Sequence, residues 1–133
     1  MTPANDTGPD SDPQALYGYV ASKLGERGIA FLHVVEGATG GPRDIAPFDW
    51  KALKAAFGGV YIANNGYDRD TAAAAVTEGT ADAVAFGRLF IANPDLVTRF
   101  RLNAPLNEPN RDTFYGGGAE GYTDYPALAE AAE

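Results

Sequence analysis

Three short apolar runs, each followed by turn residues and then by a helical pattern, constrain the fold of this chain most strongly. They occupy residues 29–35, 60–64 and 81–86. Each has the length of a strand rather than of a helix, and nearly continuous apolar runs are typical of parallel strands covered on both faces. We therefore expect an α/β fold in which three parallel strands alternate with helices.

Start and stop signals place the helices between those runs. Asp12-Pro13 supplies an N-cap followed by proline at the first helical position, and Asn93-Pro94 repeats that signal. Gly28 and Gly79 suit the left-handed residue that follows a helix. The predicted helices cover about 13–27, 48–57, 69–78 and 94–102.

The number of strands indicates how much of a fold is present. Alternating strands and helices belong to a doubly wound sheet or to a (β/α)₈ barrel, and a closed barrel needs eight strands and roughly 250 residues. We expect one partial domain over residues 1–133, in which 1–12 form a loop, 13–102 form βα units and 103–133 form an ordered tail.

Composition excludes several classes of function. The chain has no cysteine, which removes disulfides and thiolate chemistry, and its net charge of −8 argues against a nucleic-acid partner. Its longest apolar run is too short to cross a membrane, and residues 1–12 lack the pattern of a secretory signal. We therefore expect a cytoplasmic protein with neither a nucleic-acid nor a membrane partner.

The ends of the second and third apolar runs carry residues suited to holding an anion. Asn65 and Gly66 follow one run, and Gly87 and Arg88 follow the other. Ligands of parallel α/β folds bind at the carboxyl ends of the strands, where glycine allows close backbone approach and a guanidinium matches phosphate oxygens. The alternative is that both glycines only permit tight turns and Arg88 pairs with a surface carboxylate, and the pattern supports both interpretations equally.

Other polar and aromatic residues have competing interpretations. His33 lies within the first apolar run, which favours a structural role with a hydrogen-bonded neighbour over catalysis. Glu36 is either a site residue or an ordinary loop carboxylate, and residues 116–118 (Gly-Gly-Gly) predict a turn. The aromatic residues of 113–126 require burial in a core or in a ligand pocket. The sequence offers no metal-ligand cluster and no Ser-His-Asp arrangement.

Two long motifs resemble the C-terminal part of the Old Yellow Enzyme family. The first is FGRLFIANPDL at residues 86–96, and the second, after Pro105-Leu106-Asn107, is FYGGGAEGYTDYP at 114–126. The resemblance extends from about residue 10 to residue 128. It implies a (β/α)₈ barrel enzyme that uses FMN and NAD(P)H to reduce activated alkenes.

The resemblance also implies roles for particular residues. It makes the three strands the sixth, seventh and eighth of the barrel. It implies that the backbone at Asn65 and Gly66, together with Gly87 and Arg88, holds the FMN phosphate. Phe114 would lie close to the flavin ring, and Tyr115 would line the substrate pocket.

The catalytic residues of the family lie in the first half of its barrel, so the resemblance provides none in this chain, and His33 lies on a different strand. We expect the phosphate-holding portion of an FMN-dependent oxidoreductase. One alternative is a non-catalytic truncated fragment that needs a partner to cover its open strand edges. Another is a barrel enzyme with a different phosphorylated substrate, which the motif at 114–126 disfavours.

Overall fold

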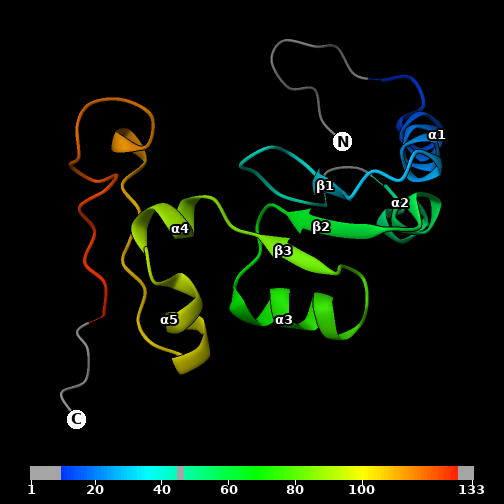
Figure 1. Ribbon diagram of the computed structural model, residues 1–133. Coiled ribbons are helices and arrows are strands. Elements are labelled where there is room, and N and C mark those ends of the chain that lie inside the picture. Colours follow the sequence, from blue (N-terminus) through cyan, green and yellow to red (C-terminus); the bar gives the residue numbers. More distant parts are fainter. Residues whose placement is uncertain (1–9, 45–46, 129–133) are drawn as a thin grey trace. The chain divides into compact units, whose positions relative to one another are not determined.

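The computed structural model describes residues 10–44 and 47–128 (Figure 1). The chain forms two compact units that meet between Ala85 and Phe86. The first unit contains α1 (Pro13–Glu26), β1 (Phe31–Val35), α2 (Trp50–Phe57), β2 (Val60–Asn64), α3 (Arg69–Thr77) and β3 (Ala83–Ala85). The second contains α4 (Arg88–Ala92), α5 (Leu96–Leu102) and a short 3₁₀ helix, Arg111–Thr113.

A parallel sheet in the order β1–β2–β3 forms the centre of the first unit (Figure 1). β1 pairs with β2 over its whole length, from Phe31 opposite Val60 to Val35 opposite Asn64. β3 has three residues, fewer than the run 81–86 suggested. The prediction of parallel strands alternating with helices is confirmed, and the arrangement is consistent with part of a (β/α)₈ barrel.

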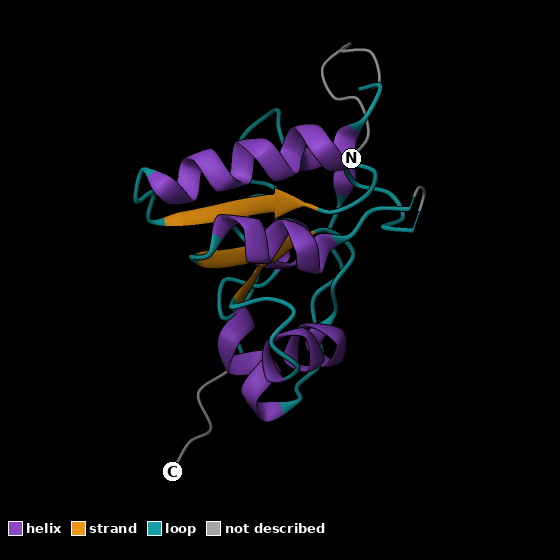
Figure 2. Cartoon of the chain, turned by 90° about the vertical axis from the view of Figure 1, so that its right-hand side faces the viewer, coloured by secondary structure: helices purple, strands orange, loops and turns teal. Residues whose placement is uncertain are grey.

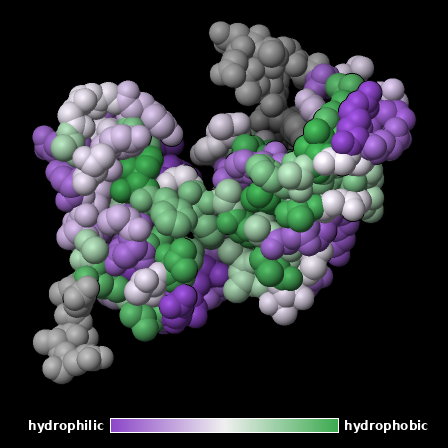
Figure 3. Space-filling model, viewed as in Figure 1, coloured by the Kyte–Doolittle hydropathy of each residue, from purple (hydrophilic) through white to green (hydrophobic). Residues whose placement is uncertain are grey.

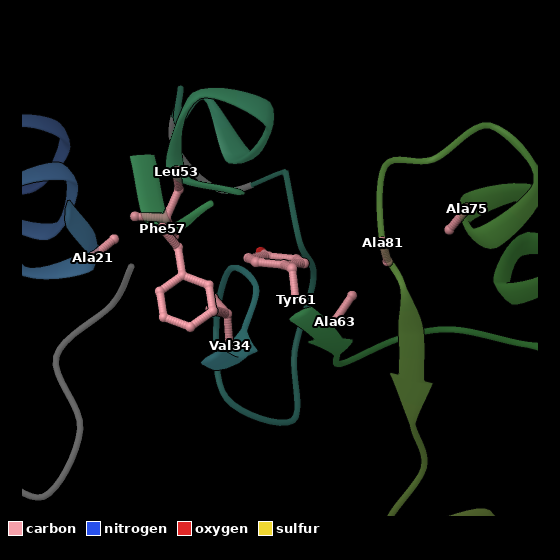
Figure 4. Close-up of a cluster of buried hydrophobic side chains, with 8 residues drawn as sticks. All are labelled: Ala21, Val34, Leu53, Phe57, Tyr61, Ala63, Ala75 and Ala81. Atoms are coloured by element: carbon pink, nitrogen blue, oxygen red, sulfur yellow. The ribbon is translucent and has the colours of Figure 1, made fainter. Parts of the chain in front are cut away.

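Helices cover one face of this sheet. Figure 2 shows α1 and α2 lying against the strands, and Figure 4 shows side chains of all three helices of the unit, α3 included, with those of the covered face. The buried cluster consists of Ala21, Val34, Leu53, Phe57, Tyr61, Ala63, Ala75 and Ala81. Tyr61 is the largest of the fully buried side chains, so its ring fills the centre of this one-sided core.

The other face of the sheet is largely bare. Phe31 and Val35 of β1 and Val60 of β2 are exposed hydrophobic residues, and green surface lies open over the strands in Figure 3. The expectation that the first strand is covered on both faces is therefore wrong. The reason is that α1, α2 and α3 supply core side chains to one face alone, whereas a closed barrel would fill the other with residues of further strands.

The second unit begins with a helix that the sequence pattern missed. α4 precedes Asn93, and α5 follows it, so the predicted helix of 94–102 is the second of two. Asn93 is fully buried and is the C-cap of α4, not the N-cap of the helix that follows, which is Asp95. Its Nδ2 donates to the Leu89 carbonyl, and its Oδ1 accepts from the Asn107 N–H at 2.7 Å. A five-residue helix is too short to produce a recognisable period.

Arg99 orders the tail of the second unit. Its Nε donates to Asp95 Oδ1 at 2.7 Å, and its terminal nitrogens donate to the carbonyls of Pro105 at 2.6 Å and Pro126 at 2.9 Å. The second oxygen of Asp95 accepts from the Leu128 N–H at 2.7 Å. Arg99 is 4% exposed. A buried guanidinium paired in this way joins α5 to the segment at Pro105 and to the segment at Pro126.

Gly25 and Gly18 provide a matched test of the packing of α1. A Cβ at Gly25 would overlap the carbonyl oxygen of Phe57, whereas a Cβ at Gly18 would meet nothing within 4 Å. We expect Gly25→Ala to lower the free energy of unfolding by about 1–3 kcal/mol because of overpacking. Gly18→Ala should raise it by roughly 0.5–1 kcal/mol, because alanine suits a helix interior better. Urea unfolding followed by circular dichroism measures both, and equal effects would contradict this packing.

Candidate functional site

The carboxyl ends of the strands come together at one edge of the sheet in the first unit. The Glu36 N–H, just after β1, donates to the Asn64 carbonyl at 3.1 Å. The Asn64 side chain in turn donates to the Ala85 carbonyl, at the end of β3, at 2.8 Å. The loops that follow β1 and β2 therefore start from neighbouring points, and Gly87 follows two residues after Ala85.

A left-handed turn follows β2. Asn65 has φ +89° and Gly66 has φ +68°. Asn65 is buried, and its Nδ2 donates to the carbonyls of Glu36 at 2.6 Å, Ala38 at 2.8 Å and Gly41 at 3.1 Å. Because the amide nitrogen of its side chain bonds the loop after β1, Asn65 can donate to a ligand only through its backbone N–H.

Gly66 lies at the exposed surface of this turn. No hydrogen bond to another described residue engages its N–H. Its left-handed φ is one that glycine adopts without strain. Gly66 therefore combines an open backbone N–H with a conformation that favours glycine.

Gly87 and Arg88 begin the second unit and are both exposed. A Cβ at Gly87 would meet nothing within 4 Å, and no side chain caps the helix that follows it. Within 10–44 and 47–128, the Arg88 side chain forms neither an ion pair nor a hydrogen bond. The alternative that Arg88 pairs with a surface carboxylate finds no support, and its guanidinium is free for a ligand.

Glu36 is the centre of a buried polar cluster that sequence analysis did not find. It is 5% exposed, and its two carboxylate oxygens accept from the Tyr61 hydroxyl at 3.0 Å and from the Tyr67 hydroxyl at 2.8 Å. Arg43 NH1 lies 3.5 Å from the same carboxylate, and its guanidinium carbon lies 4.0 Å from the centroid of the Tyr67 ring. Glu36 is therefore not an ordinary solvated loop carboxylate.

The two tyrosines of this cluster titrate above the ordinary range. Burial, followed by the charge of Glu36, raises the pKa of the Tyr61 hydroxyl far above its usual value. Burial and the hydrogen bond to Glu36 raise the pKa of Tyr67 to about 12. Both hydroxyls therefore stay protonated at neutral pH and remain hydrogen-bond donors to Glu36.

His33 lies on the bare face of the sheet. Its side chain is exposed, and no described residue forms a hydrogen bond with it. The expectation of a hydrogen-bonded neighbour is wrong, because the alternation of the strand directs residue 33 away from the face that α1 and α2 cover.

The neighbouring aromatic residues Phe114 and Tyr115 of the second unit differ in burial. Phe114 is 4% exposed, whereas Tyr115 is 91% exposed. Their rings contact edge to face, with centroids 5.9 Å apart. Phe114 therefore packs within the unit, as one of the two alternatives held, whereas Tyr115 is exposed. Residues 116–118 form a bend where a turn is predicted, and Gly117 has φ +98°.

The described residues contain no group of three or more side chains that could hold a metal ion. No helix in the same part of the chain is long and apolar enough to span a membrane.

Comparison with known proteins identifies the family. The chain matches the NADH:flavin oxidoreductase / NADH oxidase family over residues 14–107. This chain belongs to that family, among the Old Yellow Enzymes. A putative 12-oxophytodienoate reductase 12 of Oryza sativa subsp. japonica is 46% identical over 129 residues, which are 90% of this chain and 32% of that protein. A 12-oxophytodienoate reductase-like protein of Solanum lycopersicum is 44% identical over 92% of this chain and 34% of its own length.

Solved Old Yellow Enzyme structures match the same portion. Morphinone reductase is 48% identical with a TM-score of 0.82, over 90% of this chain and 32% of that one. The old yellow enzyme of Trypanosoma cruzi is 39% identical with a TM-score of 0.82, over 90% of this chain and 31% of that one. The chain therefore spans about a third of the length of the relatives it matches.

Alkaline pH tests the cluster around Glu36. An unfolded Tyr67 loses its proton near pH 10, whereas the folded protein keeps it until about pH 12. The contribution of Tyr67 to stability is thus complete below pH 10 and is lost as the pH rises toward 12. We expect the difference in unfolding free energy between the wild type and Tyr67→Phe to shrink over this window, measured by urea unfolding at successive pH values. A constant difference would contradict the raised pKa of Tyr67.

Proposed function

We propose that this chain binds the phosphate of FMN through the backbone of Asn65 and Gly66, together with Gly87 and Arg88. One observation carries the proposal: in a member of a flavin oxidoreductase family, Arg88 is exposed and makes no pair with any described residue. The open N–H groups of Gly66 and Gly87 fit the same ligand, because backbone donors and a guanidinium fork suit phosphate oxygens.

The sheet pairing supports the grouping of these residues. Asn64 bonds the end of β3 at Ala85, so β2 and β3 end at the same edge, and Gly87 follows Ala85 by two residues in the sequence. We infer that β1, β2 and β3 correspond to the sixth, seventh and eighth strands of a (β/α)₈ barrel. The solved relatives, which this chain matches over about a third of their length, support that assignment.

FMN, when bound, would supply hydride transfer from NAD(P)H to an activated alkene. In this chain Arg88 would bind and orient the phosphate, and Tyr115 would form a wall of the substrate pocket. Phe114 is buried and its ring contacts that of Tyr115 edge to face, so it would support Tyr115 beside the flavin. The support for a nicotinamide donor is the structure of morphinone reductase in complex with tetrahydroNAD, 47% identical to this chain. A cytoplasmic location remains a prediction.

The bare sheet face favours a second proposal. Phe31, Val35 and Val60 expose apolar surface that the described residues leave uncovered. Such a face needs further βα units, in a longer protein or in a partner, before a barrel interior can form. On this proposal the chain alone is inactive and associates through its open face.

The phosphate site predicts a difference between two flavins. FMN carries a phosphate and riboflavin does not, so FMN should bind more tightly. We expect Arg88→Met to weaken FMN binding about 10- to 100-fold, as for loss of hydrogen bonds to a charged group. Riboflavin binding should not change. Quenching of flavin fluorescence measures both, and Arg101→Met, which removes another exposed arginine, should behave as the wild type. Equal affinity of the wild type for the two flavins, or no binding of FMN, would contradict the proposal.

Association through the bare face is tested with the chain alone. Phe31 is exposed at the start of β1, at the edge of the sheet opposite the candidate site. We expect the wild type to self-associate with rising concentration and Phe31→Asp to remain a monomer, because a charge on the face opposes its burial. Sedimentation velocity distinguishes the two, and a wild type that stays monomeric throughout would argue against this second proposal.

A further inference from the structure

We propose that Arg43 is a second phosphate-binding arginine, held beside Gly66 by the Glu36 carboxylate and the Tyr67 ring. The inference rests on the proposed FMN site and adds a residue to it. Arg43 lies in the loop after β1, 23 residues before Gly66 in the sequence, and no sequence motif marks it.

Arg43 lies directly against the turn that follows β2. A Cβ built on Gly66 would lie 3.8 Å from Arg43 Cγ and 3.9 Å from its Nε, which is ordinary van der Waals contact. The guanidinium stacks on Tyr67, the next residue along the chain, with its central carbon 4.0 Å from the ring centroid. An anion that accepts from the open N–H of Gly66 would therefore approach the Arg43 side chain.

The ion pair with Glu36 positions the guanidinium without saturating it. The distance from NH1 to the carboxylate is 3.5 Å, longer than the 2.7–2.9 Å typical of a charge-assisted hydrogen bond. Both carboxylate oxygens already accept from tyrosine hydroxyls. About a third of the Arg43 side chain is accessible, with a relative exposure of 35%. Positive charge and N–H donors therefore remain available at the surface.

Arg99 shows what a purely structural arginine looks like in this chain. Its Nε and both terminal nitrogens donate at 2.6–2.9 Å, and its side chain is 5% exposed. Arg43 has one long ion pair and a stacked ring instead. Stacking fixes the plane of a guanidinium while leaving its edge free, which is the arrangement that suits bidentate binding of phosphate.

The helix after Gly66 cannot replace this arginine. Asp68 caps α3: its carboxylate accepts from the Thr71 N–H at 2.8 Å, and its own N–H donates to Thr71 Oγ1 at 3.0 Å. A capping carboxylate occupies the donors that a bound anion would need and repels it. The end of α3 nearest Gly66 therefore carries its own carboxylate, whereas the Arg43 side chain brings positive charge beside Gly66.

Titration with inorganic phosphate, followed by ¹⁵N NMR of the full chain, tests this inference without flavin. We expect phosphate to shift the Gly66 amide and the Arg43 Nε–H signals of the wild type. Arg43→Met should weaken phosphate binding at Gly66 about 3- to 10-fold, as for the loss of a partly exposed charged donor. Arg43→Gln serves as a second neutral variant if the methionine variant does not fold.

Arg27→Met is the matched control. Arg27 belongs to the same unit and is exposed, but it follows α1 at the opposite edge of the sheet, where its NH1 donates to the Lys23 carbonyl. It should bind phosphate as the wild type does. Unchanged affinity in a folded Arg43 variant, or no shift of Gly66 and Arg43 in the wild type, would overturn the inference.

A parallel titration with FMN separates the two proposals. If phosphate shifts Gly66 and Arg43 but FMN does not bind, the proposed cofactor fails while the anion site stands. If the wild type and Arg43→Met bind FMN equally well, the role of Arg43 is refuted and the proposed cofactor stands.

Discussion

The parallel pairing of β1 with β2 is the constraint on which the rest of the first unit depends. Because both strands run in the same direction and in register from Phe31 opposite Val60, their carboxyl ends finish together. The loop after β1 then meets the turn after β2, where Asn65 holds it through three carbonyls. The buried cluster of Glu36 exists only because this pairing brings Tyr61 and Tyr67 to it.

The first unit has a core on one face of its sheet and an open apolar surface on the other. A segment of a (β/α)₈ barrel should show that asymmetry. Its helices form the outer layer, and the inner face of its strands is buried only when side chains of the other strands fill the barrel interior. The asymmetry also agrees with a family match that spans about a third of the relatives. The apolar face of the sheet is therefore incomplete in this chain. The turns at the carboxyl ends of the strands, by contrast, are held by hydrogen bonds within the unit.

Local signals predicted the elements well. Asp12 does cap α1, accepting from the Ala15 N–H at 3.0 Å, and Gly79 does follow α3 with φ +72°. The predictions failed where they depended on which face of a strand is buried. An apolar run has the same pattern whether one face or both faces are covered, so a hydrogen-bonded neighbour was expected for His33 on a face where no described residue provides one. The anion-binding candidates Gly66, Gly87 and Arg88 were found because turn glycines are visible in a sequence. Arg43 was not found, because its proposed role depends on the stacking of its guanidinium on the Tyr67 ring, a contact between residues 24 positions apart in the sequence.

The sequence by itself determined the order of strands and helices, the strand-end glycines, and, through two long motifs, the family. These are local or cumulative properties of neighbouring residues, so they can be read along the chain. Only the tertiary structure decided which side chains are committed and which are free. The guanidinium of Arg99 donates three hydrogen bonds within its unit, whereas the side chain of Arg88 has no partner among the described residues. Whether a charge is paired depends on residues distant in sequence, and folding alone brings them together.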